Sequence, residues 1–168
     1  NKGSIDRGLG RSTYYRPYTS VELNYAGGLR DEITIPEKDV SGYRTEESYR
    51  FLEDDGLAYP EARLKSGEVV IGKTSPPKFL SEVREISVKA KKEASSVIRQ
   101  EESGTIESVF ITEDSQGNKV IRVKTRDLRI PEAGDKFASR YGQKGVIGRI
   151  IPQADMPFTA SGIVPDLI

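Results

Sequence analysis

The sequence contains neither cysteine nor histidine among its 168 residues. Without cysteine the chain has no disulfide bond, no thiolate metal site and no cysteine nucleophile. Without histidine, Ser-His-Asp catalysis, histidine-bound metal and an imidazole acid or base near neutral pH are excluded as well. No apolar run approaches the ~20 residues that a membrane-spanning helix needs. Together these absences exclude many familiar enzyme mechanisms.

Hydrophobic residues are also scarce for a compact domain, at 35%, while charged residues reach 31%. This composition is more polar than that of an average globular domain, so we expect the chain to rest on neighbouring protein surfaces. It begins without an initiator methionine or a signal peptide and ends on the apolar residues 163–168. Natural termini are usually polar. We therefore expect a segment of a longer polypeptide, with one or two domains.

The charges are unevenly distributed, although 26 basic and 26 acidic side chains cancel overall. Residues 31–61 hold ten acids and three bases, a net charge of −7, whereas residues 119–149 hold nine bases and three acids, a net charge of +6. A protein that coats nucleic acid indiscriminately would be basic throughout. The concentrated positive charge favours a local binding site. The alternative is that the two blocks are solvated faces that pair with each other.

The pattern along the chain predicts an α+β fold that is mostly β. An apolar stripe at helical period predicts an N-terminal helix, capped by Ser4 or Asp6 and ended by the glycines at 27 and 28. Core packing is the main role expected for its tyrosines, with a base-stacking platform as the alternative. The stripe consists of Tyr14, Tyr18, Val21 and Tyr25.

Short elements are expected in the middle of the chain. Prolines and glycines interrupt the acidic residues 31–60, which predicts short strands and turns, and the acids there would repel a phosphate backbone. In residues 79–98 the apolar positions recur at helical spacing. Periodicity alone predicts one helix there, with its lysine-rich centre facing solvent.

Residues 67–74 have the glycine and lysine spacing of a phosphate-binding P-loop. That loop must curl so that its amides face the phosphates, and a helix must begin at its lysine. Here the residues between the glycines include Val-Val-Ile, which favour extended backbone. Pro76 then biases Ser75 away from helical geometry. The segment is therefore predicted to be a strand, although a free-standing P-loop NTPase stays a formal alternative.

A β-hairpin is predicted from residue 105 to residue 126, with its turn at 114–118. Its second strand alternates between an apolar face and a face that carries Arg122, Lys124 and Arg126. These cations would lie about 6.6 Å apart along the strand, a spacing that suits successive phosphates of an extended single strand. The alternative is an ordinary solvated face of a sheet.

Residues 134–148 form a glycine-rich loop with regularly spaced cations. Glycine is costly to order, so four of them in fifteen residues suggest sharp bends or close approach to a ligand. Lys136, Arg140 and Lys144 recur every four residues in this loop. Lysine acts as a point charge on phosphate oxygens, and arginine can bind them bidentately. The loop offers no general base and no activated nucleophile, so the chemistry predicts a phosphate-holding element.

Residues 136–148, 155–159 and 162–168 resemble, in collinear order, the second-largest subunit of multisubunit DNA-directed RNA polymerases. The archaeal and eukaryotic nuclear branch is the most similar. Three shorter stretches, at 4–8, 54–57 and 70–74, resemble the same subunit further upstream. The likeness covers essentially the whole chain.

The resemblance implies two kinds of domain. Residues 12–130 would be the wall, called the flap in bacteria, which turns the RNA–DNA hybrid and borders the RNA exit. Residues 1–11 and 131–168 would belong to the hybrid-binding region, with the Gly/Lys loop in the second of these segments. Relatives are largely extended from about Lys89 onwards, so the resemblance restricts the helix predicted above to about residues 78–87.

The resemblance also implies a site. Lys136 and Lys144 match lysines that reach the active centre and contact phosphates near the RNA 3′ end, and Arg140 lies between them. No catalytic residue and no metal ligand is expected in this chain, and it would bind no cofactor itself. The catalytic Mg²⁺ of the complete polymerase is held by aspartates of the largest subunit. Tyr141 replaces the histidine of most relatives, and a phenol stays neutral near pH 7, so it cannot supply an imidazolium.

The leading hypothesis is a segment of DNA-directed RNA polymerase, a nucleotidyltransferase, that guides the RNA–DNA hybrid and contacts its phosphates. The isolated chain would be inactive. Expected partners are the DNA template, the RNA transcript, the largest subunit and the other subunits, in a nucleoid or a nucleus and without a membrane. The alternative is a wall that serves mainly as a docking surface for initiation or elongation factors, through the acidic block and the helix near 78–87.

Overall fold

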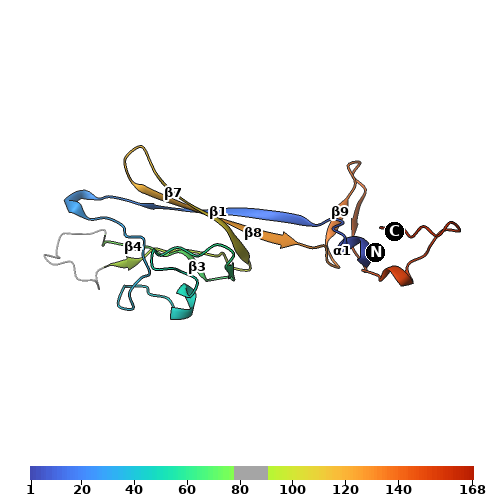
Figure 1. Ribbon diagram of the computed structural model, residues 1–168, viewed down its shortest axis with the longest axis horizontal. Coiled ribbons are helices and arrows are strands. Elements are labelled where there is room, and N and C mark those ends of the chain that lie inside the picture. The colour runs from blue at the N-terminus through green and yellow to red at the C-terminus, as the bar shows by residue number, and fades with distance from the viewer. Residues whose placement is uncertain (78–90) are drawn as a thin grey trace. The chain divides into compact units, whose positions relative to one another are not determined.

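The computed structural model describes residues 1–77 and 91–168 of the chain (Figure 1). The chain divides into two compact units. Unit 1 consists of Asn1–Tyr14 together with Leu128–Ile168, and unit 2 consists of Tyr15–Asp127. The first and last segments of the sequence therefore meet in one unit, while the middle of the chain forms the other.

Strands dominate the described residues, which confirms the predicted α+β, mostly β, class. The strands are β1 (Ser12–Glu22), β2 (Arg63–Leu64), β3 (Val69–Ile71), β4 (Thr74–Ser75), β5 (Lys92–Glu93), β6 (Ser96–Val97), β7 (Gly104–Glu113), β8 (Lys119–Arg129), β9 (Lys136–Ala138) and β10 (Lys144–Val146). The helices of the described residues are α1 (Lys2–Asp6) and three short 3-10 helices, η1 (Ala26–Gly28), η2 (Glu46–Tyr49) and η4 (Gln153–Asp155).

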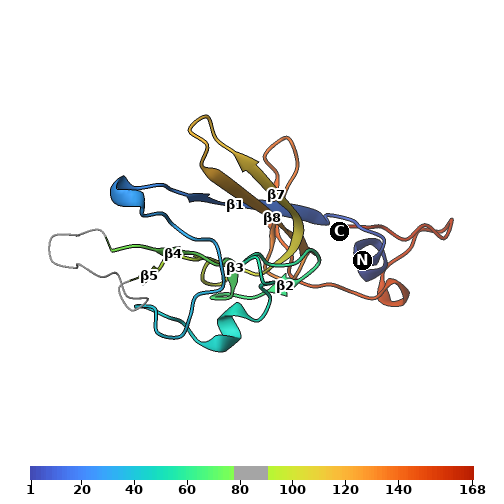
Figure 2. The same ribbon diagram turned by 60° about the vertical axis from the view of Figure 1, so that its left-hand side comes forward.

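The largest sheet has four strands in the order β1-β8-β7-β2, and its β7–β8 hairpin lies beside β1 (Figure 2). β7 and β8 pair antiparallel, with Glu113 opposite Lys119 next to the turn. The Asp114 Oδ1 atom accepts hydrogen bonds from the amides of Gln116 at 2.8 Å and Asn118 at 2.9 Å. Hydrogen bonds from the Asn118 side chain and backbone lower the pKa of Asp114. The predicted hairpin and its turn are therefore confirmed.

The hydrophobic core lies within unit 2, under one face of this sheet. Alternation along β8 buries Ile121, Val123 and Thr125, while Arg122 between them is exposed. Short strands and bridges supply the rest of the core, which consists of Leu57, Ala58, Ala62, Leu64, Val70, Ile71, Ile98, Ile106, Ile121 and Val123. Removing this apolar area from water contributes roughly 25 cal/mol per Å² to folding.

The helix predicted over the tyrosines at 14–25 is wrong. The structure has a short helix at Lys2–Asp6, capped by the Asn1 side chain rather than by Ser4 or Asp6, and residues 12–22 form strand β1. Pro17 lacks an amide hydrogen and would break a helix interior, whereas the tyrosines, threonines and valine of this segment favour strands. Tyr14 and Tyr18 are four residues apart, a spacing that fits the period of a strand as well as that of a helix. The helical pattern is therefore misleading.

Residues 67–74, which have the glycine and lysine spacing of a P-loop, contribute to strands, as predicted. All three residues of β3 are buried, and the strand pairs antiparallel with β6. β4 follows at Thr74–Ser75 and pairs with β5. No loop remains that could wrap around a phosphate between residues 67 and 74.

The acidic block folds with less regular structure than expected. Residues 31–61 contain the single 3-10 helix η2 and several isolated β-bridges, but no strand. The turns that its prolines and glycines predict are present, and the short strands are not. The helix predicted near 78–87 lies outside the described residues. Within the described ranges, no helix has the length and apolar character needed to cross a membrane.

Candidate nucleic-acid interface

The Gly/Lys loop at 134–148 folds as a small β-hairpin in unit 1. β9 and β10 pair antiparallel, with Lys144 opposite Ala138, Gly145 opposite Phe137 and Val146 opposite Lys136. At the open end, the Gly134 amide donates to the Ile147 carbonyl at 2.8 Å, and the Ile147 amide donates to the Asp135 carbonyl at 2.8 Å. These bonds fix the register, so this element is an ordered hairpin rather than a flexible loop.

The register places Lys136 and Lys144 on the same face of the hairpin. Residues opposite each other in an antiparallel pair share a face, and so do residues two apart in one strand. Lys144 lies opposite Ala138, which is two residues from Lys136. The two lysines are thus diagonal neighbours, with backbone positions roughly 7–8 Å apart. Both are exposed.

The tip of the hairpin carries the third predicted cation. The Ser139 Oγ atom accepts hydrogen bonds from the amides of Tyr141 at 3.3 Å and Gln143 at 3.4 Å. Gly142 adopts a φ of +78°, which closes the turn. Arg140 is exposed at this tip, and Tyr141 is 94% exposed. Tyr141 therefore projects into solvent and does not help to support the hairpin.

The opposite face of the hairpin is supported by the N-terminal segment of unit 1. Phe137 is half-buried and alternates with Lys136, so it points away from the lysine face. A Cβ atom on Gly10 would lie 2.7 Å from Phe137 Cζ and 2.9 Å from Pro131 Cγ. Gly10 also has a φ of +66°. Only glycine fits at this position without strain, and its lack of a side chain lets Phe137 seat the hairpin.

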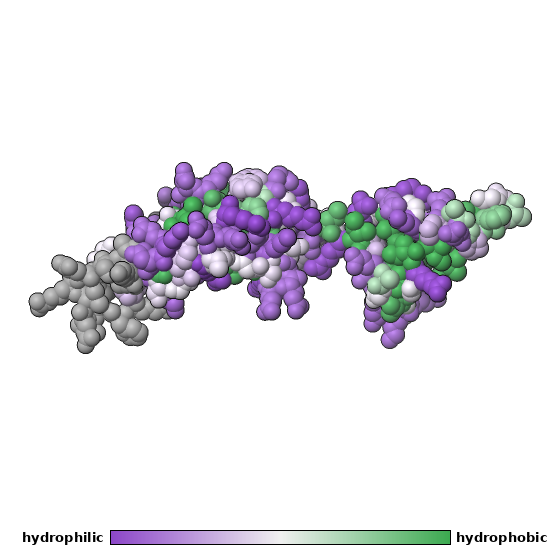
Figure 3. All heavy atoms as spheres, turned by 90° about the horizontal axis from the view of Figure 1, so that it is seen from below, coloured by the Kyte–Doolittle hydropathy of each residue, from purple (hydrophilic) through white to green (hydrophobic). Residues whose placement is uncertain are grey.

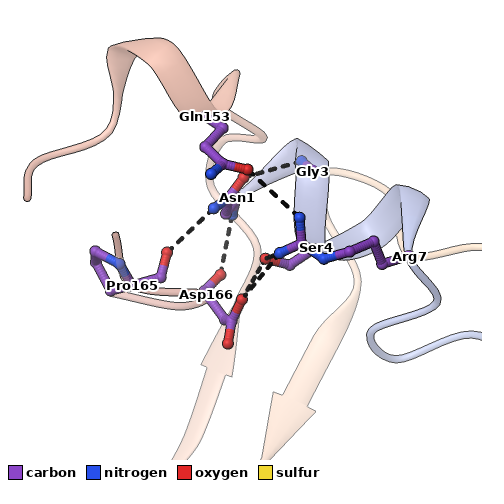
Figure 4. A network of polar contacts seen from close by, with 7 residues as sticks. All are labelled: Asn1, Gly3, Ser4, Arg7, Gln153, Pro165 and Asp166. Carbon is purple, nitrogen blue, oxygen red and sulfur yellow. Dashed lines mark hydrogen bonds and ion pairs between the residues drawn. The ribbon is translucent and has the colours of Figure 1, made fainter. Parts of the chain in front are cut away.

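A polar network joins the first and last segments of the same unit (Figure 4). The Asn1 ammonium group donates to the Asp166 carbonyl at 3.0 Å, and Asn1 Nδ2 donates to the Pro165 carbonyl at 3.3 Å. The Ser4 hydroxyl donates to the Asp166 carboxylate, which also lies 3.7 Å from the Arg7 guanidinium group. These contacts hold α1 against residues 165–166 and so help to fix the segment that carries Gly10.

Among the described residues, the hairpin cations have no acidic partner. In residues 1–77 and 91–168, no ion pair involves Lys136, Arg140 or Lys144. An exposed, unpaired ammonium group needs only partial desolvation to bind a phosphate, and no internal salt bridge has to break first. The chemistry of this face is therefore suited to an anionic ligand.

The predicted cations of β8 have different surroundings. Arg126 is held by two carboxylates, Glu61 at 2.6 Å and Glu107 at 2.7 Å. The Lys124 ammonium group lies 4.4 Å from the centroid of the Tyr15 ring, a cation–π contact. Arg122 is exposed and has no acidic partner among the residues described. The alternation predicted for this strand is present, but Arg126 is already neutralised within the fold.

The lysine of the P-loop-like segment is part of a buried ion pair. Lys73 Nζ lies 2.5 Å from Asp31 Oδ2 and donates to the Val21 carbonyl at 2.7 Å. Burial alone would raise the pKa of Asp31, but hydrogen bonds from Lys73 and Ser75 and the Lys73 charge outweigh it, so the pKa is lowered. Lys73 is thus unavailable to a nucleotide. Among the described residues no group of three or more His, Cys, Asp or Glu side chains could hold a metal ion.

Next to the hairpin, unit 1 has an open groove of about 770 Å³. Its apolar lining includes Val146, Met156, Leu167 and Ile168, and Lys144 and Arg149 also line it. Hydrophobic atoms gather visibly on the surface of this unit (Figure 3), where Val146, Ile163, Leu167 and Ile168 are each at least 64% exposed. Monomeric proteins rarely leave such surface uncovered, which agrees with the expectation that the chain rests on neighbouring protein.

Sequence reasoning missed the residues that position the cations. The Phe137–Gly10 contact, the Ser4–Asp166 network and the Tyr15–Lys124 pair all join segments that are far apart in sequence. One signal was present: Phe137 is the single aromatic residue between Lys136 and Arg140, and a hydrophobic residue that alternates with charge marks the supported face of a strand.

Comparison with known proteins identifies the family. The model of the family RNA polymerase Rpb2, domain 6, matches residues 1–168. The chain therefore belongs to this family of second RNA polymerase subunits, which confirms the resemblance seen in the sequence.

Relatives of the chain include archaeal and eukaryotic polymerase subunits. The DNA-directed RNA polymerase subunit Rpo2 of Saccharolobus solfataricus is 53% identical over 169 residues, and that of Sulfolobus acidocaldarius is 54% identical. The DNA-directed RNA polymerase II subunit RPB2 of Schizosaccharomyces pombe is 42% identical over 170 residues. All of the chain is covered in each case, but it spans only 14% to 15% of the length of these relatives.

Proposed function

We propose that this chain is the part of a DNA-directed RNA polymerase that holds phosphates of the RNA–DNA hybrid near the RNA 3′ end. The observation that carries the proposal is the register of β9 and β10, which gives Lys136 and Lys144 a common exposed face. Neither lysine has an acidic partner in the part of the chain that the structure describes. Two ammonium groups on neighbouring backbone positions can bind one phosphate together or two adjacent phosphates. Arg140 at the tip adds a third exposed cation to the hairpin.

The contribution of the chain is electrostatic positioning. Phosphoryl transfer is catalysed largely by orienting the reactants and stabilising negative charge. The hairpin supplies fixed positive charge for both purposes. Magnesium neutralises charge in phosphoryl transfer, but the described residues offer no ligand cluster for it. The ligands of the magnesium would come from the rest of the enzyme. The partners of the chain would be the DNA template, the transcript and the other subunits.

The domain roles follow from the same proposal. Residues 1–11 and 131–168, which bring the supported hairpin and its network together, would act in hybrid binding. Residues 12–130 would form the wall beside the hybrid. The β-rich core of unit 2 gives such a wall the rigidity that guiding a nucleic acid requires.

The test is a Lys144→Ala substitution in the complete polymerase, with RNA extension measured at low nucleotide concentration. Loss of one charge-assisted phosphate contact, worth about 1.5–3 kcal/mol, should slow initiation and extension roughly tenfold or more. Assembly should be unchanged, because Lys144 is exposed and unpaired in the described structure. Lys65→Ala is the matched control, since Lys65 is exposed in unit 2 and forms no ion pair among the described residues. Equal extension rates for Lys144→Ala and Lys65→Ala would overturn the proposal.

A second candidate function is a docking surface for transcription factors. Several acids of residues 31–61 are exposed and outside any ion pair of the described residues, including Glu47, Glu53 and Asp54. Others are already paired inside the fold, as Asp31 is with Lys73 and Glu61 is with Arg126.

Charge reversal separates the two functions. Lysine substitutions at Glu46, Glu47, Asp54 and Asp55 should abolish factor binding in a pull-down and spare RNA extension if docking resides there. Glu113→Lys, on the exposed end of β7, is the control for a general effect of charge. Retained factor binding after the fourfold reversal would remove this surface from consideration.

A further inference from the structure

We propose that unit 2 binds an extended segment of another protein along an unpaired backbone edge at residues 33–35, and that this segment carries a basic side chain. The mode of binding is strand addition, in which the main chain of the partner hydrogen-bonds to the free edge. The inference rests on the proposed function only in taking the chain to act within the complete polymerase. It uses no residue of the hairpin at 134–148 and none of the four acids named above for charge reversal.

One side of this backbone segment is already paired within unit 2. The Glu32 amide donates to the Thr74 carbonyl and the Thr74 amide donates to the Glu32 carbonyl, each at 2.9 Å. The Thr34 amide donates to the Gly72 carbonyl at 3.2 Å. A Cβ atom on Gly72 would lie 2.5 Å from the Thr34 carbonyl oxygen, so the two backbones approach as closely as only glycine allows. These contacts hold residues 32–34 in antiparallel register against residues 72–74.

The other side of the segment is unpaired. In an extended chain the amide and carbonyl groups of successive residues point to opposite sides, so those of Ile33 point away from Thr74. Neither the backbone of Ile33 nor that of Ile35 has a hydrogen-bond partner among the described residues. Both residues line a pocket of about 340 Å³. Pro36, which has no amide hydrogen, ends the edge. Such an edge is a template for a strand from another chain.

The charges around the pocket favour a basic side chain on that strand. Lys91 pairs with Glu32 at 2.6 Å, and the Arg30 Nε atom lies 4.0 Å from a carboxylate oxygen of Glu22. Glu37 also lines the pocket, but it is exposed and forms no ion pair within the described ranges. A lysine or arginine side chain of the partner would pair with this remaining carboxylate.

A buried hydroxyl group of the pocket lacks a partner as well. Thr74 lines the pocket and is 3% exposed, yet its Oγ1 atom has no hydrogen-bond partner in the part of the chain that the structure describes. Buried polar groups are normally satisfied, so this atom indicates that the pocket is incomplete without an occupant. Nucleic acid is a poor occupant, because its phosphates would be repelled by Glu37 and by the net charge of −7 on residues 31–61. A protein segment supplies both backbone groups and a cation.

The experiment titrates the complete polymerase into a fluorescent hexapeptide of alternating lysine and valine and measures the anisotropy. The expected result is binding, with slower hydrogen exchange of the Ile33 and Ile35 amides. The control peptide carries N-methyl groups on all its amides, which keeps its side chains and charge but removes every backbone donor. It should bind at least about tenfold more weakly, because each hydrogen bond contributes about 0.5–1.5 kcal/mol.

Variants of the polymerase locate the contact. Ile35→Pro removes one backbone donor of the edge and should weaken binding of the parent peptide about fivefold, whereas Ile35→Val keeps the donor and should bind as the wild type does. Glu37→Gln should weaken binding about threefold, since one partly exposed ion pair is lost. Glu53→Gln is the matched control, because Glu53 is an exposed acid of the same block that does not line the pocket.

Each other outcome overturns the inference. Equal binding of the two peptides would show that charge alone attracts them, and equal binding by Ile35→Pro and Ile35→Val would place the peptide elsewhere on the enzyme. Absent binding with already slow exchange at Ile33 and Ile35 would show that another part of the polymerase covers the edge. Absent binding with fast exchange would show that the edge accepts no strand. RNA extension by Ile35→Pro, measured beside Lys144→Ala, keeps a failure here separate from a failure of the proposed phosphate contact.

Discussion

Two lysines of this chain follow glycine-rich sequence and have opposite environments. Lys73 closes the P-loop-like segment of unit 2, where its ammonium group is buried between Asp31 and the Val21 carbonyl. Lys144 lies in the hairpin of unit 1, where it is exposed and has no carboxylate partner within the described ranges. The spacing of glycine and lysine is similar, but only one of these side chains can reach a ligand.

The difference shows which sequence features distinguish a lysine that is paired within the fold from one that is available for binding. The residues between the glycines of the first segment are β-branched and become the buried strand β3. In the second segment, glycine and small residues surround the lysines, and Phe137 supports the hairpin from one side only. A lysine that follows a buried strand, as Lys73 follows β3, is a structural charge that must be paired. A lysine on a hairpin with one supported face is available for binding.

The largest effect on stability is expected from replacing Lys73. Lys73→Ala leaves the Asp31 carboxylate buried without its counter-charge, which should lower the free energy of unfolding by about 3–5 kcal/mol. Lys144→Ala should change the same quantity by no more than about 0.5 kcal/mol. Urea denaturation of the two variants measures this contrast.

A double variant sharpens this test. Replacing both partners, as in Lys73→Met with Asp31→Leu, should cost less than Lys73→Ala alone, because no charge is left buried. Equal stabilities of Lys73→Ala and Lys144→Ala would contradict the assignment of Lys73 to a structural pair.

The next effect concerns the support of the hairpin. Gly10→Ala places a methyl group against Phe137 and Pro131 and forces alanine into a left-handed conformation. This should destabilise unit 1 by about 1–3 kcal/mol. Hydrogen exchange in the complete enzyme should show faster exchange in β9 and β10, while Gly27→Ala, at a glycine with open surroundings, should leave those amides unchanged.

A smaller effect is expected from pH. The pKa of Asp31 is lowered by its hydrogen bonds and by Lys73 in the folded state. A lowered folded-state pKa stabilises the fold fully above the unfolded value of about 3.9, and this contribution is lost as the pH falls through the folded pKa. The unfolding free energy should therefore fall below about pH 4. The Asp31→Asn variant should show a shallower fall, and identical pH profiles would argue against this pair.

The smallest effect is expected at Arg126. Its side chain is 39% exposed and bridges Glu61 and Glu107, so Arg126→Ala should lower the unfolding free energy by only about 0.2–1 kcal/mol. The loss should shrink in high salt, because partly exposed charges are screened. A salt-independent loss above that range would mean that Arg126 packs as part of the core.

Much of the fold could be predicted because it depends on local signals. The β7–β8 hairpin has alternating strands and an Asp-Ser-Gln-Gly-Asn turn, and the structure confirms both. The helix predicted over residues 14–25 is wrong, because tyrosines four apart fit a strand as well as a helix and Pro17 would break a helix interior. A proline in the middle of an apolar stripe is the stronger signal.

The candidate site was predictable in its residue types but not in its geometry. Glycines and lysines at 134–148 indicated a phosphate-holding element, yet the common face of Lys136 and Lys144 depends on a strand register that spacing does not fix. The partners of Arg126 and Lys124 come from residues 61, 107 and 15, so their availability could not be read from β8 alone. Tertiary contacts decide which cations are free.

The most direct test of the central claim combines a protein change with a change in the RNA. RNA primers that carry one uncharged methylphosphonate linkage, moved stepwise from the 3′ end, would be extended by the wild-type polymerase and by Lys144→Ala. The proposed contact predicts one position near the 3′ end where the neutral linkage slows the wild-type enzyme roughly tenfold but does not slow the variant further. Additive losses at every position would contradict it, because Lys144 would then bind no phosphate of the transcript.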